Sequence, residues 1–153
     1  MAIYVAGVPC GLCGLPVDPG DEKVLFPPFV PNRRDPLHVF SDGVFHQRCV
    51  AEHSLGERAT RAAATAALGD PRVQTCVVCG KSFTGPDDYF ATGYLGADVD
   101  EFNFICVHPS HFDRWERAAE FREVVLRLQQ GDAWDGPRIV FEPLLGWIRQ
   151  RDR

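Results

Sequence analysis

Two Cys-x-x-Cys motifs, one in each half of the chain, constrain this sequence more than any other feature. Cys10 and Cys13 form the first motif, and Cys76 and Cys79 form the second. A glycine follows each motif and allows the tight turn that points both thiolates to one side. A further group of Cys and His residues comes a few dozen residues after each motif. The spacing therefore predicts one metal site in each half of the chain.

In the first half, the second ligand pair is His46 and Cys49, which lie three residues apart at the predicted start of a helix. Soft thiolates and an imidazole in a set of four suit a tetrahedral Zn²⁺. The first predicted zinc site consists of Cys10, Cys13, His46 and Cys49.

In the second half, Cys106 takes the third ligand position, and either His108 or His111 takes the fourth. We favour His111, because it follows the predicted helix cap Ser110 in the position that Cys49 holds in the first half. The second predicted zinc site consists of Cys76, Cys79, Cys106 and His111. With four protein ligands each, both ions are expected to be structural, and no catalytic residue is assigned.

The elements between the ligands repeat as well. In the first half, we expect a strand at 23–26, a β-hairpin at 37–46 around Asp42-Gly43, and helical segments from 47 and over 58–68. In the second half, a strand over 89–91 corresponds to 24–26, and a segment over 101–106 takes the place of 44–46. A helix over 110–131 follows, and a short strand over 138–141 and a helix over 144–148 close the chain.

These expectations define an α+β fold of two tandem, duplicated zinc units, each made of a knuckle, a β-hairpin and a helix. The first unit spans residues 1–70, the second 71–131, and a C-terminal strand and helix extension 132–153 packs on the body. We expect the extension to supply core through Trp134, Phe141, Leu145 and Trp147, because zinc modules alone have little core.

The order of knuckle, hairpin and helix resembles treble-clef zinc-finger proteins over roughly residues 8–68 and 74–130. The His-x-x-Cys pair at 46–49 also resembles the first module of LIM domains, although the gap between Cys13 and His46 is longer here. The resemblance implies zinc and a fold without implying one function, because treble clefs occur in nucleases, ribosomal proteins, ubiquitin ligases and adaptors.

The net charge and the number of cysteines limit the classes of protein to which this chain can belong. The chain has 153 residues, 16 Lys and Arg against 21 Asp and Glu, and a net charge of -5, which disfavours general nucleic-acid binding. No apolar run reaches the length of about 18 residues that a membrane helix needs, and no basic leader opens the chain. We therefore expect a cytoplasmic protein without a membrane partner, in which six cysteines serve metal binding rather than disulfides.

The sequence favours protein–protein recognition by a non-enzyme that acts as an adaptor, regulator or inhibitor. The apolar segment 26–31 and the clusters 89–90 and 94–95 are either partner surfaces or core. The alternative is a nucleic-acid-binding protein or an HNH-like nuclease, for which His38, Asp42 and His53 are the candidates. Arg33-Arg34 and residues 149–153 are local basic spots, more typical of solvated surface than of a nucleic-acid site.

Overall fold

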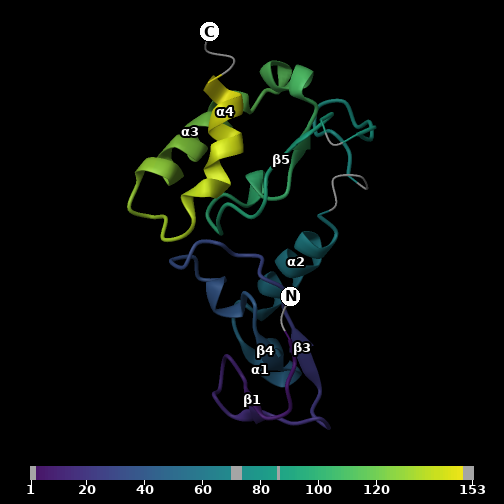
Figure 1. Cartoon of the computed structure of the whole chain (residues 1–153), viewed down its shortest axis with the longest axis vertical. Coiled ribbons are helices and arrows are strands. Elements are labelled where there is room, and N and C mark those ends of the chain that lie inside the picture. Colours follow the sequence, from purple (N-terminus) through teal and green to yellow (C-terminus); the bar gives the residue numbers. More distant parts are fainter. Residues whose placement is uncertain (1–2, 70–73, 86, 150–153) are drawn as a thin grey trace.

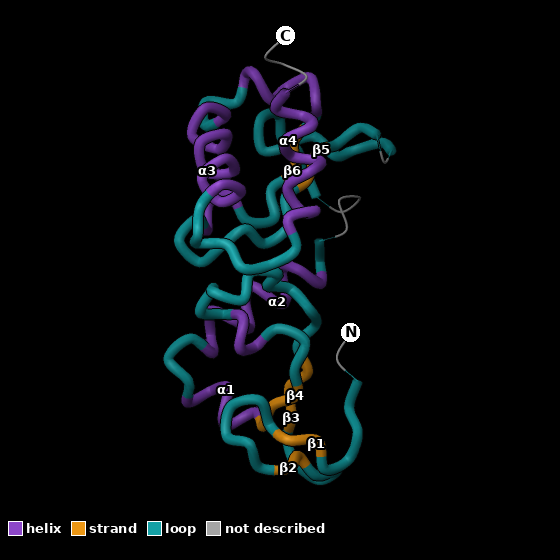
Figure 2. The backbone as a smooth tube through the Cα atoms, turned by 60° about the vertical axis from the view of Figure 1, so that its left-hand side comes forward, coloured by secondary structure: helices purple, strands orange, loops and turns teal. Residues whose placement is uncertain are grey.

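The chain folds into two units that stack end to end along the long axis of the molecule (Figure 1), and helix α2 (Gly56–Ala67) leads from the first unit toward the second. The computed structural model describes residues 3–69, 74–85 and 87–149, apart from the side chains of Trp147 and Arg149. Short antiparallel strand pairs and helices make this a small α+β fold, and Figure 2 shows how little of it is strand.

From residue 3 to residue 69, the first unit contains two strand pairs, one 3₁₀ helix and two α-helices, and the knuckle lies between β1 and β2. Its elements are β1 (Val8–Pro9), β2 (Pro16–Val17), β3 (Lys23–Leu25), the 3₁₀ helix η1 (His38–Phe40), β4 (Val44–His46), α1 (Gln47–Glu52) and α2 (Gly56–Ala67). Strand β1 pairs with β2, and β3 pairs with β4. The helix expected directly after His46 is confirmed.

Within its described residues, 74–85 and 87–149, the second unit contains one strand pair, several 3₁₀ helices and two α-helices. Its elements are β5 (Phe90–Ala91), η3 (Asp100–Phe102), β6 (Cys106–Val107), η4 (Pro109–Arg114), α3 (Ala118–Gln130), η5 (Arg138–Phe141) and α4 (Glu142–Arg149). Strand β5 pairs antiparallel with β6. None of the helices in the described parts of the chain is long and apolar enough to cross a membrane.

Each unit has its own apolar core. In the first unit, small side chains let α2 approach the core closely, since Ala59 and Ala63 face it and are buried. Gly56 permits the sharp step from α1 to α2, because a Cβ there would lie 1.8 Å from the carbonyl oxygen of Val50. In the second unit, α3 and the C-terminal segment share one core, which includes the buried Trp134 and Phe141.

The expected hairpin over 37–46 is wrong. Residues His38–Phe40 form the 3₁₀ helix η1, and β4 pairs instead with the distant β3. The physical reason is the burial of Leu37 and Phe40, both fully inaccessible to solvent. Residues three apart lie on one side of a 3₁₀ turn, whereas a strand would point them to opposite faces.

Two further expectations need correction in the second unit. The helix expected over 110–131 begins as the 3₁₀ helix η4, and its α-helical part starts only at Ala118. The strand expected over 138–141 is the 3₁₀ helix η5, which runs directly into α4. There only Phe141 is buried, while Ile139 is 66% exposed, so the segment lacks the two apolar faces of an internal strand. The short C-terminal helix is confirmed, and the side chain of Trp147 lies outside the described residues.

A polar loop joins the two units. The Asn32 side chain donates to the carbonyl of Ala133 at 3.0 Å and accepts the N–H of Asp135 at 2.8 Å. The Asp35 carboxylate accepts the N–H of Ala97 at 2.7 Å and the hydroxyl of Tyr94 at 3.3 Å. Asn32 and Asp35 are both buried despite their polarity, so these bonds replace the water that each group loses.

Apolar contact reinforces this junction. The Tyr94 ring is buried and joins the core of the first unit, where it meets Phe29 edge-on with ring centroids 6.2 Å apart. The two units are therefore joined by packing as well as by hydrogen bonds.

We predict that Asp35→Ala lowers the free energy of unfolding by about 2–4 kcal/mol, because it leaves several buried donors without an acceptor. Urea unfolding monitored by tryptophan fluorescence measures the change. Asp98→Ala is the matched control, since Asp98 is exposed and its ion pair with Arg127 is long, at 3.9 Å. Equal effects of the two substitutions would contradict the role of Asp35 in the junction.

Candidate metal centres

The two knuckles have the same backbone conformation. The N–H of Gly14 donates to the carbonyl of Cys10 at 2.9 Å, and the N–H of Gly80 donates to the carbonyl of Cys76 at 2.8 Å. Both glycines have a positive φ, 73° and 68°, in the region that other residues avoid. This turn places the two thiols of each motif on the same side of the chain.

The remaining ligands come from the junction of a strand and a helix. His46 is the last residue of β4 and the N-cap of α1, and Cys49 lies in the first turn of that helix. His108 follows β6 and is the N-cap of η4, and His111 lies in its first turn. The same backbone arrangement thus presents a ligand pair with a spacing of three residues in each unit.

In the first unit, the side chains of Cys10, Cys13, His46 and Cys49 form one cluster, with all ligand atoms within 4.8 Å of one another. The Nδ1 atom of His46 lies 3.5 Å from the Cys13 Sγ and 3.8 Å from the Cys49 Sγ. A tetrahedral zinc ion with bonds of about 2.3 Å to sulfur and about 2.0 Å to nitrogen separates such ligand atoms by about 3.5 Å. The cluster therefore fits Zn²⁺.

In the second unit, the side chains of Cys76, Cys79, His108 and His111 form a cluster that meets the same 4.8 Å limit. The Cys79 Sγ lies 3.5 Å from Nδ1 of His108, and the Cys76 Sγ lies 3.7 Å from Nδ1 of His111. These separations also match a tetrahedral zinc ion. The chain thus carries two Cys/His clusters, each of which can bind a metal ion.

The second cluster corrects the predicted set, because both histidines belong to it and Cys106 does not. Cys106 pairs with Ala91 in the strand register, as Val44 pairs with Leu25 in the first unit. Its buried Sγ donates instead to the side-chain oxygen of Gln74 at 3.2 Å. His108 is therefore the counterpart of His46. The sequence does contain a sign of this set, because His108 and His111 are three residues apart, as His46 and Cys49 are.

Local hydrogen bonds prepare one thiol of each knuckle for metal. Burial by itself would raise the pKa of Cys10, but N–H groups of the knuckle and of His46 outweigh it and lower the pKa to about 6. In Cys76, burial is likewise outweighed, by the N–H of His108 and the side chain of His111, and the pKa falls to about 5. Metal ligands must be thiolates, so both positions favour the form that binds zinc.

An aspartate supports one histidine of each cluster, a role that the sequence did not reveal. His46 Nε2 lies 3.4 Å from a carboxylate oxygen of Asp21, and His108 Nε2 lies 3.7 Å from one of Asp88. His46 Nε2 also lies 3.1 Å from the carbonyl of Pro16, to which it donates. The hydrogen bond at Nε2 leaves Nδ1 of His46 for the metal and fixes the orientation of that ring, whereas the Asp88 contact of His108 is a longer, electrostatic one. In the sequence, the corresponding signal is the acidic pair that follows each knuckle, Asp21-Glu22 in the first unit and Asp87-Asp88 in the second.

The nuclease candidates have structural partners. Nδ1 of His38 donates to the carbonyl of Val30 at 3.0 Å, and Nδ1 of His53 accepts the N–H of Leu55 at 3.1 Å. The His53 ring also meets Phe40 edge-on. Asp42 occupies a turn with φ of 58°. The structure does not bring these three residues into either Cys/His cluster.

The basic pair Arg33-Arg34 lies at the junction of the two units. Arg33 forms an ion pair with Asp135 at 4.0 Å, and Arg34 donates to the carbonyl of Asp132. The basic C-terminal spot begins at Arg149, and its side chains lie outside the described residues.

Comparison of the chain with protein-family models, with curated proteins and with solved structures finds no match. The metal centres therefore stand on their geometry, which is consistent with two zinc sites.

We predict that His108→Ala reduces the bound zinc from two ions per chain to one, whereas Cys106→Val leaves both ions in place. Valine is the matched substitute, because Val44 holds the equivalent strand position in the first unit. Native mass spectrometry counts the ions directly. Loss of an ion from Cys106→Val, with retention of both ions by His108→Ala, would restore Cys106 as a ligand.

Proposed function

We propose that the protein is a non-enzymatic protein-binding module, held folded by two structural zinc ions. The single observation that carries the proposal is that each cluster supplies four protein ligands. A structural zinc ion takes four protein ligands, whereas a catalytic one keeps a position for water or substrate. With all four positions filled, the ions support folding, and the activity lies on the surface.

We further propose that each unit is a treble clef. Each unit has a knuckle, then a strand pair, then a helical turn that begins at the third ligand. The register supports the duplication, since Gly11 donates to the carbonyl of Val44 at 3.1 Å and Val77 donates to that of Cys106 at 3.0 Å. In the second unit, a 3₁₀ helix replaces the α-helix that directly follows the third ligand in the first.

The proposed binding surface is an apolar groove of about 380 Å³ between the two units and the C-terminal segment. Segment 28–31, residues 91 and 93–95, Val140 and the start of α4 line it together. Phe26, Phe29 and Val30 are buried, so most of the proline-broken segment belongs to the core, while Pro28 remains exposed at the groove. Ile139 directly precedes the lining residue Val140 in the chain. Its apolar side chain is 66% exposed.

The chemistry of the groove favours an uncharged, apolar segment of a partner protein as its occupant. No charged side chain lines the groove within the described chain, and nucleic acid would need cations there. Gly93 is exposed at the groove and, because it has no side chain, leaves space for an apolar segment of a partner. The volume suits one or two apolar side chains of such a segment. Nucleic-acid binding remains the alternative from another class.

We predict that Gly93→Glu abolishes partner binding while leaving the fold intact. A Cβ at Gly93 meets no atom within 4 Å, so the carboxylate would enter the groove without a clash. Burying this charge against an apolar partner is costly, and at least a tenfold loss of affinity is expected. Gly20→Glu is the matched control, since a Cβ there also meets open space, in the turn before β3.

Wild type, Gly93→Glu and Gly20→Glu are each used for affinity purification from the source cells, with and without nuclease treatment. Mass spectrometry then identifies the proteins that each chain retains. The proposal expects a protein that wild type and Gly20→Glu retain and Gly93→Glu loses, and direct titration with that purified protein should reproduce the loss. Equal capture by all three chains, or capture that nuclease treatment removes, would contradict the proposal. Self-association that Gly93→Glu abolishes would identify a second copy of this chain as the occupant instead.

A further inference from the structure

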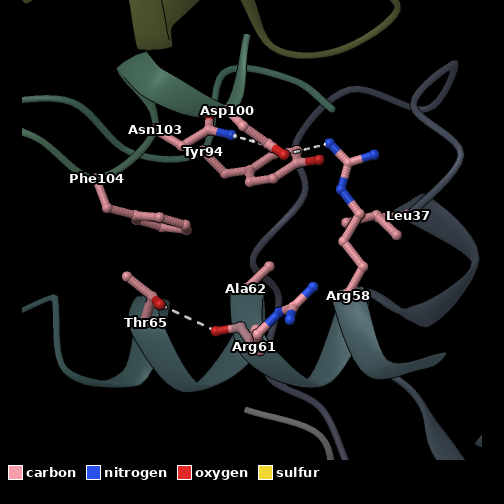
Figure 3. A pocket seen from close by; sticks show the side chains of 9 residues that line it. All are labelled: Leu37, Arg58, Arg61, Ala62, Thr65, Tyr94, Asp100, Asn103 and Phe104. Carbon is pink, nitrogen blue, oxygen red and sulfur yellow. Dashed lines mark hydrogen bonds and ion pairs between the residues drawn. The ribbon is translucent and has the colours of Figure 1, made fainter. Parts of the chain in front are cut away.

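A second cavity lies between α2 and residues 94–104 (Figure 3), and unlike the apolar groove it is lined by charged side chains. We call it the arginine cleft, and its volume is about 270 Å³. Arg58, Arg61 and Ala62 enter it from one face of α2, while Tyr94 and Phe104 face them from the second unit. The cleft is thus lined by charged, polar and apolar side chains together.

An aromatic ring closes one end of the cleft. Figure 3 shows the Phe104 ring pointing toward the space above α2. Phe104 has a φ of 56°, which is an outlier for a bulky residue. Its N–H donates to the carbonyl of Gly93 at 3.0 Å, and its ring meets Tyr94 with centroids 6.0 Å apart. The strained backbone therefore holds an aromatic face at the cleft.

The two arginines at the cleft differ in how firmly their guanidinium groups are paired with carboxylates. Arg58 is paired with Asp100 at 2.6 Å and donates to the carbonyl of Ala97, so its charge is locally neutralised. Arg61, one turn further along α2, contacts Glu57 at 2.9 Å through a single nitrogen. Both partners of this pair are largely exposed, 71% and 83%, and such pairs are weak. A guanidinium carries five donors, so Arg61 has capacity for an anion.

We propose that the arginine cleft binds a small aromatic anion. Its ring packs against Phe104 and the Ala62 methyl group, and its carboxylate or phosphate receives hydrogen bonds from Arg61. The size agrees, because a cavity of about 150 Å³ holds one benzene ring and the arginine cleft is larger. The cleft adjoins the apolar groove proposed for the protein partner, since Tyr94 lines both, but Arg61 and Phe104 line the cleft and not the groove.

Indole-3-acetate and adenosine 5′-monophosphate are suitable probes, since they carry a carboxylate and a phosphate on aromatic bodies. Isothermal titration of the zinc-loaded chain should show binding of at least one of them. Arg61→Gln should weaken that binding at least tenfold, and Phe104→Asn should remove it, since asparagine tolerates a positive φ. Arg127→Gln is the matched control, because Arg127 is a similarly exposed arginine on the other long helix.

The outcomes separate the sources of the anion. Binding of indole-3-acetate alone identifies an aryl carboxylate, and binding of the nucleotide alone identifies a phosphate. Neutral indole and cyclohexaneacetate should bind at least tenfold more weakly than indole-3-acetate if that probe is bound. No binding of either probe at 5 mM, or binding that Arg61→Gln leaves unchanged, overturns the proposal. Arg61 is 71% exposed, so its substitution tests the site even if Phe104→Asn fails to fold.

Discussion

Each half of this protein depends on one cluster of four Cys and His ligands that ties a knuckle to the start of a helix. The strands around the clusters are only two or three residues long, too short to be stable by themselves. Zinc binding contributes on the order of 10 kcal/mol per site in small domains. Zinc bound at these clusters would therefore compensate for the scarcity of regular strand, and Asp21 and Asp88 lie beside the ligands His46 and His108.

The second constraint is the polar loop that carries Asn32 and Asp35 from the first unit into the second. Its hydrogen bonds reach Ala97 on one side and Ala133 on the other. Both cavities lie beside this junction, and Tyr94 lines each of them. The surfaces that we propose for binding thus exist only while the units are docked, and this junction, rather than the Cys/His cluster inside each unit, holds the two halves in register.

The sequence was sufficient for the first ligand set and for the helices after His46, because ligand spacing and helix composition are local. It failed where long-range contacts decide. Cys106 looked like a ligand, and only its strand pairing with Ala91 places it in the position of Val44. Asn32 and Asp35 stand in a polar stretch of the sequence, and their burial depends on partners roughly 60 to 100 positions away. No periodicity in the chain encodes such partners.

The central claim is that the chain holds two zinc ions, one in a Cys₃His set and one in a Cys₂His₂ set. Cadmium NMR of the ¹¹³Cd-substituted protein tests it most directly, because the chemical shift of the metal rises with each thiolate that it binds. We expect two resonances of equal intensity, one at the position of a three-sulfur site and one at that of a two-sulfur site. Two resonances at the three-sulfur position would make Cys106 a ligand, and the absence of a bound-metal signal would contradict the whole account.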